Sequence, residues 1–278
     1  MKTDYEVGEF LNLINEKFLD NTIKSNYNDK QKDIDLISQI DGIFKVNPVK
    51  IYKLNMYNIF YITVIHNNYE IKKNQLVGKI FHIPENIEKK NVEQIIDLID
   101  GPLINVLPYT KHNVAIVAVG EDLYKFKRDD GFNEKLIQKL SRYNGNIIYK
   151  EINEEIPEKI ILSMKRALSC SDMIFVIYSK EMNTVLIDKT LDFLKISQTI
   201  PIFIFPGNNI KFFYLEEKPV LIIPEKVLDI KVSALNIILS RLFCGEKLNF
   251  EEMVKYSYGG ICFFCSICIY PICPLGKY

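Results

Sequence analysis

The chain has 278 residues, of which 48% are hydrophobic and 25% charged, a balance typical of a folded chain with about two compact domains. Its 35 Lys and Arg equal its 35 Asp and Glu, so no net field attracts nucleic acid or an anionic membrane, and an anionic ligand needs a local site. The sequence shows no signal peptide and no apolar stretch near the roughly 18 residues of a membrane span, which predicts a cytoplasmic protein without nucleic-acid or membrane partners.

Two segments precede the central part of the chain. Residues 1–40 are predicted to form a polar helical segment with two apolar stripes, which consist of Phe10, Leu11, Ile14 and Phe18 and of Ile34, Leu36, Ile37 and Ile40. Residues 41–110 change to short alternating runs such as NIFYITVIH, which predict a small β-rich unit. Gly101-Pro102 and Pro108 mark its end.

Residues 111–245 are predicted to form an α/β domain. Apolar runs that do not alternate indicate strands buried on both faces, and their alternation with amphipathic stretches indicates a three-layer, mostly parallel sheet covered by helices. The expected strands are 114–119, 146–151, 173–178 and 201–205. The expected helices are 132–143, 156–169 and 184–195. In such sheets ligands lie outside the carboxyl ends of the strands, which places Gly120, Glu121 and Asp122 at the rim.

The last segment, residues 246–278, ends in GGICFFCSICIYPICPLGKY and contains Cys262, Cys265, Cys268 and Cys273. Two successive Cys-x-x-Cys intervals, followed by a return of the chain after Pro271, are typical of a tetrahedral zinc site or an iron–sulfur cluster. Bacterial ferredoxins have three residues before the last cysteine, whereas four stand between Cys268 and Cys273 here. A disulfide-bonded tail and four buried thiols are the alternatives. For a single zinc ion we expect sulfur atoms about 3.5–4 Å apart, with the intervening apolar residues wrapped around the site.

The α/β segment resembles a known family. VAVGEDLY, RDDGFNEKLIQKL, YNGNIIYKEI and SDMIFVI are similar to the molybdopterin-binding domain shared by molybdopterin molybdenumtransferases and the adenylyltransferases of molybdenum cofactor biosynthesis. A subgroup in anaerobic bacteria has a segment like DGIFKVN (residues 41–47) before that domain and a similar glycine- and cysteine-rich tail after it. The resemblance covers about residues 41–278.

The resemblance implies a binding site for molybdopterin or a related nucleotide, with Mg²⁺ held by nearby carboxylates. Its residues would be Gly120, Glu121, Asp122, Asp130, Pro206 and Gly207. A glycine at a strand end lets backbone N–H groups face a phosphate, and carboxylates suit Mg²⁺ or the N–H groups of a pterin. Judged on the residues alone, an acidic loop that caps the following helix explains the same pattern. A homo-oligomer is compatible with this reading.

The chain departs from the family after its third expected strand. The family has a Gly-Gly pair there, whereas this chain has Tyr178, Ser179 and Lys180, whose side chains would prevent close approach of the backbone to a phosphate. We therefore assign no catalytic residue, and the replacement of the Gly-Gly pair argues against molybdenum transfer. Two hypotheses follow: a molybdopterin-binding-like protein with a Cys₄ metal site, or a catalytically degenerate scaffold whose metal tail serves in interaction or in redox or metal sensing.

Overall fold

The computed structural model describes residues 4–99, 101–121, 124, 132–178 and 184–277. The chain divides into two compact units, one formed by Met1–Pro108 with Lys277–Tyr278 and the other by Tyr109–Gly276. None of the helices in the described part of the chain has the length and apolar character needed to cross a membrane.

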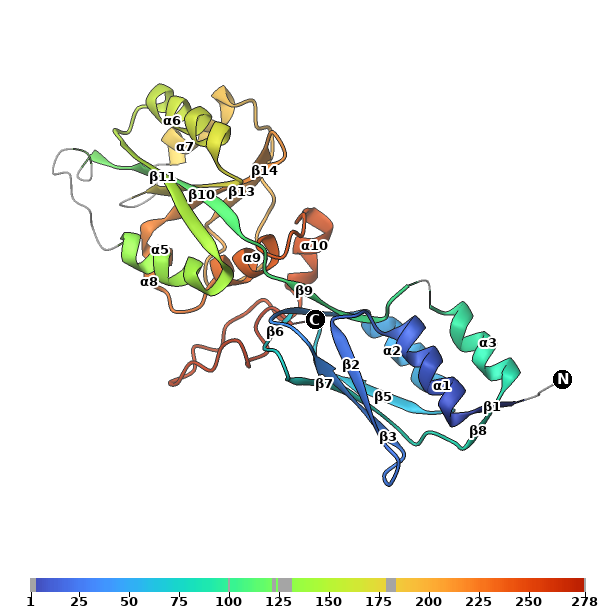
Figure 1. Ribbon diagram of the computed structural model, residues 1–278. Helices are drawn as coiled ribbons and strands as arrows, with labels where there is room; N and C mark the ends of the chain where they lie inside the picture. Colours follow the sequence, from blue (N-terminus) through green and yellow to red (C-terminus); the bar gives the residue numbers. More distant parts are fainter. Residues whose placement is uncertain (1–3, 100, 122–123, 125–131, 179–183, 278) are drawn as a thin grey trace. The chain divides into compact units, whose positions relative to one another are not determined.

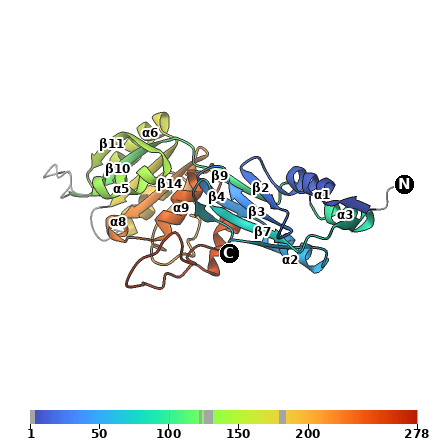
Figure 2. The same ribbon diagram turned by 60° about the horizontal axis from the view of Figure 1, so that its bottom comes forward.

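The first unit combines small antiparallel sheets with short helices (Figure 1). Its strands are β1 (Asp4–Glu6), β2 (Ile23–Asn28), β3 (Asp33–Ser38), β4 (Gly42–Val46), β5 (Tyr61–Val64), β6 (Tyr69–Ile71), β7 (Leu76–Phe81), β8 (Asn86–Glu88) and β9 (Ile104–Pro108). Its helices are α1 (Val7–Leu13), which continues as a π-helical turn (Ile14–Phe18), α2 (Pro48–Met56) and α3 (Lys89–Asp97). The sheets have the strand orders β2-β3-β7-β5, β6-β4-β9 and β1-β8, and Figure 2 shows β2, β3 and β7 side by side.

The two apolar stripes expected in residues 1–40 have different outcomes. The helix expected around Phe10 and Ile14 is present, and both side chains are fully buried in the core of the unit. The helix expected around Ile34–Ile40 is wrong, because this segment is β3, paired with β2 and β7. Ile34 and Leu36 are fully buried two positions apart, which is the period of a strand. The β strands expected between residues 41 and 110 are present as β4 to β9.

The second unit is built on a five-stranded sheet of order β11-β10-β12-β14-β13. The strands are β10 (His112–Val119), β11 (Gly145–Asn153), β12 (Met173–Tyr178), β13 (Lys211–Leu215) and β14 (Lys218–Pro224). All neighbouring strands are parallel except the β13–β14 pair, which is antiparallel. This confirms the mostly parallel α/β sheet and three of its four predicted strands.

Helices cover both faces of this sheet, with α6 and α7 on one side and α5, α8 and α9 on the other (Figure 1). Their bounds are α5 (Phe132–Leu140), α6 (Pro157–Cys170), α7 (Thr184–Phe193), α8 (Glu225–Asp229), α9 (Ala234–Leu242) and α10 (Phe250–Val254), with 3₁₀ turns at Ser141–Tyr143 and Lys255–Ser257. Every residue of β12 is buried, as expected for a strand covered on both faces.

The fourth predicted strand, residues 201–205, is wrong. The hairpin of β13 and β14 completes the sheet instead, and β14 takes the place beside β12. Residues 200–205 make only isolated bridges: Ile200 pairs with Phe212, and Phe205 pairs with Ile261 of the cysteine-rich tail. The backbone of this segment therefore bridges the edge strand β13 at one end and the tail at the other, without forming a strand of its own.

Candidate functional site

The carboxyl ends of three neighbouring parallel strands lie together at one edge of the sheet in the second unit. Val119 at the end of β10 is in register with Asn153 at the end of β11 and with Tyr178 at the end of β12. Gly120 follows directly and donates its N–H to the Asn153 carbonyl at 3.1 Å. The structure therefore places Gly120 at the predicted ligand edge.

Glu121 is the other predicted residue of this loop that the structure describes, and its side chain is exposed. The Gly120 carbonyl accepts a hydrogen bond from the Tyr124 N–H at 3.0 Å. Asp122 and Asp130 lie outside the described residues.

The side chain of Asn153 was not expected at this edge. It is 5% exposed, and its Nδ2 has no hydrogen-bond acceptor among the described residues. A buried amide group without an acceptor is costly, so a ligand oxygen that accepted from it would remove this cost. The sequence offered no signal for this residue, because an asparagine at a strand end is ordinarily a turn residue.

Tyr178 does not obstruct the edge in the way the sequence suggested. Its ring is 3% exposed and packs in the apolar core beneath α6 and α7, together with residues such as Val119 and Ile187. Burial raises the pKa of its hydroxyl well above the ordinary value of tyrosine. Ser179 and Lys180 lie outside the described residues.

Pro206 and Gly207 have a structural role in the turn that precedes β13. The Pro206 carbonyl accepts a hydrogen bond from the Ala234 N–H at the start of α9, at 2.8 Å. Gly207 has φ +107°, and a Cβ there would lie 2.9 Å from the Ala234 nitrogen. Helix packing alone therefore requires a glycine at this position.

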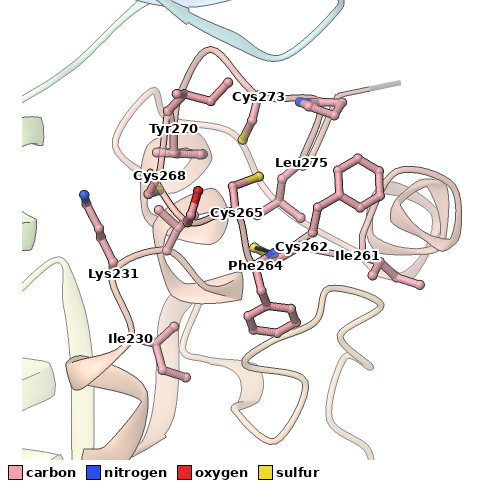
Figure 3. Close-up of a pocket in the computed structure, with 15 residues that line it drawn as sticks. Ile230, Lys231, Ile261, Cys262, Phe264, Cys265, Cys268, Tyr270, Cys273 and Leu275 are labelled. Carbon is pink, nitrogen blue, oxygen red and sulfur yellow. Dashed lines mark hydrogen bonds between the residues drawn. The ribbon is translucent and has the colours of Figure 1, made fainter.

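The four cysteines of the tail line one cavity of about 480 Å³. Figure 3 shows the sulfur atoms of Cys265 and Cys273 turned toward each other across the tail. Cys265 is exposed, and Cys262, Cys268 and Cys273 are half-buried. The spacing in the sequence thus brings all four cysteines to the lining of one cavity.

Backbone hydrogen bonds hold this tail against the second unit. Phe205 donates to the Gly260 carbonyl at 2.7 Å, and Cys262 donates to the Phe205 carbonyl at 2.9 Å. A Cβ at Gly260 would lie 2.2 Å from the carbonyl oxygens of Phe203 and Tyr256. The absence of a side chain at Gly260 is thus a condition for this docking.

The thiols do not converge as tightly as the sequence predicted. Within the described ranges, no group of three or more His, Cys, Asp or Glu side chains has an arrangement that could hold a metal ion. The apolar side chains between the cysteines do not cover the thiols in this structure, because Phe263, Ile267 and Ile272 are 74%, 77% and 71% exposed. One local feature does suit a thiolate: the Phe264 N–H donates to the Cys262 sulfur at 3.4 Å.

The chain was also compared with known proteins. No family model and no curated protein matches it. Among solved structures it is similar to the tungsten cofactor synthesizing protein MoaB of Pyrococcus furiosus, with 14% identity, a TM-score of 0.36, and coverage of 48% of this chain and 94% of that one. It is similar to the molybdopterin biosynthesis enzyme MoaB of Thermus thermophilus at 13% identity and a TM-score of 0.37, with 49% and 98% covered. It is also similar to the molybdopterin biosynthesis MoeA protein of Pyrococcus horikoshii, with 11% identity, a TM-score of 0.34, and coverage of 85% of this chain and 75% of that one. At TM-scores this low the likeness decides nothing about function.

Proposed function

We propose that the second unit binds a molybdopterin-type ligand at the carboxyl edge of its sheet, as a protein of molybdenum cofactor biosynthesis. The observation that supports this most directly is the buried Asn153 amide group beside Gly120, which lacks an acceptor among the described residues. The carbonyl of a pterin ring and the oxygens of its phosphate are both acceptors for such a donor.

The other residues of the proposed site have distinct roles. Gly120 would allow the backbone to approach the ligand, while Glu121, Asp122 and Asp130 would supply carboxylates to Mg²⁺ or to pterin N–H groups. Pro206 and Gly207 remain predicted contacts, made through backbone atoms. We propose binding rather than molybdenum transfer, because the family's Gly-Gly pair is replaced in this chain.

Calorimetric titration with molybdopterin and with its adenylylated form tests the proposal. We expect micromolar binding to the full chain, weakened about tenfold or more by Asn153→Leu, because a hydrogen bond to a charged group contributes about 1.5–3 kcal/mol. Asn146→Leu is the matched control, since Asn146 is exposed near the other end of the same strand. Absence of binding to the unaltered chain would overturn the proposal and favour the degenerate scaffold.

A second function is supported by the tail. We propose that Cys262, Cys265, Cys268 and Cys273 bind one zinc ion or one iron–sulfur cluster, with a small closing movement of the loop. The supporting observation is that all four line the same cavity, while a backbone N–H already donates to one sulfur. When bound, the metal would order the exposed tail, and the deprotonated thiols would supply its ligands.

Elemental analysis and a visible spectrum of protein purified without oxygen test this second proposal. Stoichiometric zinc without visible absorbance indicates the zinc site, and brown protein with iron and sulfide indicates the cluster. Cys265→Ser should release the metal, whereas Cys170→Ser should retain it, because Cys170 lies on α6 outside this cavity. Folded protein with no metal and four freely titrating tail thiols would exclude both. Metal binding without pterin binding would favour an interaction or sensing role.

A further inference from the structure

A basic cavity of about 390 Å³ lies between α5 and the turn that joins α8 to α9. Four cationic side chains and one carboxylate line it, together with an asparagine: Lys135, Lys139, Arg142, Lys231, Asp229 and Asn236. The chain as a whole has no net charge, so this is a local excess of positive charge.

The spacing of the residues in and after α5 explains how the cations meet. Lys135 and Lys139 are four positions apart and Arg142 follows three later, so all three project from one side of this segment. Lys231 comes from the opposite wall, in the turn before α9. It also borders the cysteine cavity, where Figure 3 labels it beside Ile230.

Lys139 is the most informative of these residues, because its side chain is buried. It is 9% exposed, and its ammonium donates to the Ile230 carbonyl at 2.9 Å and to Asn236 Oδ1 at 3.3 Å. Both acceptors are neutral, whereas an ammonium group has three donors and a full charge. Burial, together with the charge of Arg142, lowers the pKa of Lys139. An anion in the cavity would counter both effects.

The other cations are placed where they can contact an anion in the same cavity. The Arg142 guanidinium lies over the rings of Tyr143 and Tyr270, 5.9 Å and 5.6 Å from their centroids. Such stacking orients a planar group that can bind an oxyanion through two N–H donors. Lys135 forms an ion pair with Asp229, and the lining contains two further lysines beyond that pair, Lys139 and Lys231.

We propose that this cavity binds a tetrahedral oxyanion, either free or as the phosphate group of a small ligand. Lys139 would donate from the floor of the cavity, and Arg142 and Lys231 would donate from its two sides. Several donors that converge from different elements suit an anion with several acceptor oxygens. The cavity volume also falls within the range of small-molecule sites, so an attached organic group can be accommodated. This site is separate from the proposed pterin edge.

Calorimetry with inorganic phosphate and with glycerol phosphate, at constant ionic strength and against a chloride control, tests the proposal. We expect saturable binding with one site per chain. Lys139→Met should weaken it about tenfold or more, and Lys231→Ala should weaken it several-fold, because each removes a charge-assisted hydrogen bond. Lys165→Met is the matched control, since Lys165 is exposed on α6 on the other face of the sheet.

The two probes separate the sources of the anion. Tighter binding of glycerol phosphate indicates a phosphorylated ligand, whereas tighter or equal binding of inorganic phosphate indicates a free oxyanion. Non-saturating binding, or binding unchanged in both Lys139→Met and Lys231→Ala, would overturn the proposal. If Lys139→Met does not fold, phosphate binding by Lys231→Ala tests the proposal instead. This variant is expected to fold, because Lys231 is exposed and outside the core. Asn153→Leu should leave phosphate binding unchanged, which distinguishes this site from the pterin edge.

Discussion

The side-chain ammonium of Lys277 donates a hydrogen bond to the backbone carbonyl of Asn68, 209 positions earlier in the chain, at 3.1 Å. Lys277 is 6% exposed and lies 4.7 Å from the centroid of the Tyr69 ring. Asn68 in turn donates its N–H to the Phe44 carbonyl at 2.9 Å. Lys277 and Phe44 are thus joined through Asn68 within the first unit.

Replacement of Lys277 should therefore destabilise the first unit. We expect Lys277→Met to lower its free energy of unfolding by about 1–3 kcal/mol, because a buried charge-assisted hydrogen bond and the contact with the Tyr69 ring are lost. Urea denaturation monitored by circular dichroism measures this change. Lys24→Met is the control, since Lys24 is exposed on β2 of the same unit. Equal stability of the two variants would show that the contact contributes nothing.

Stability at low pH should depend on Glu252. Burial by itself raises the pKa of Glu252, but hydrogen bonds from Lys255 and Arg241 and the charge of Arg241 outweigh it and lower the pKa to about 2. The stabilisation of the folded state by this carboxylate is fully present above about pH 4.3, the pKa of a glutamate in the unfolded chain. It is lost as the pH falls toward 2, the pKa in the folded state.

Glu252→Gln tests this expectation. In this variant the free energy of unfolding should lose the part of its pH dependence that comes from protonation of Glu252. The variant should also lose about 1–3 kcal/mol near neutral pH, because the Arg241 side chain is only 2% exposed and donates to Glu252 at 2.7 Å. Glu251→Gln, an exposed neighbour on α10, should keep the wild-type acid transition in urea titrations between pH 2 and 5. An unchanged transition in Glu252→Gln would contradict the role of this ion pair.

Gly260→Ala should detach the cysteine-rich tail. The added Cβ would lie 2.2 Å from the carbonyl oxygens of Phe203 and Tyr256, which forces the Gly260 carbonyl away from the Phe205 N–H that donates to it. We expect faster proteolytic cleavage of residues 258–276 and faster reaction of the tail thiols, with the second unit still folded. Gly8→Ala is the control, because no atom lies within 4 Å of a Cβ at that position. A tail as resistant as in the wild type would rule out this docking.

Stability at high pH should depend on Tyr214. Burial raises the pKa of its hydroxyl to about 12, and the Leu248 N–H donates to the same oxygen at 2.9 Å. A raised tyrosine pKa contributes stability below the unfolded value of about 10, and this contribution is lost as the pH rises toward 12. Tyr214→Phe should therefore not lose this stability at high pH. At neutral pH its free energy of unfolding should be lower by about 1–3 kcal/mol, because the Leu248 N–H loses its acceptor. Ultraviolet titration and denaturation at pH 9–12 would show both effects.

The central sheet could be predicted because a strand that is buried on both faces is apolar along its whole length, which is visible in the sequence of that strand alone. Residues 114–119 and 173–178 are continuous apolar runs, and β10 and β12 occupy interior positions with helices on both sides. The position of Gly120 at the carboxyl edge follows from the same pattern. The four cysteines were also predicted as neighbours, because their short spacing limits how far apart they can lie.

Tertiary structure decided the features that depend on a distant partner. An apolar run such as 201–205 fits a sheet strand or a bridge to the tail equally well, and the choice was made by the β13–β14 hairpin and by Ile261. Around Ile34 the apolar residues fit periods of both 2 and 3.6, and pairing with β2 and β7 selected the strand. The buried amide of Asn153 and the basic cavity around Lys139 also required the fold. A sequence records which side chains are polar, whereas only packing determines which of them lose water and which charges come to lie together.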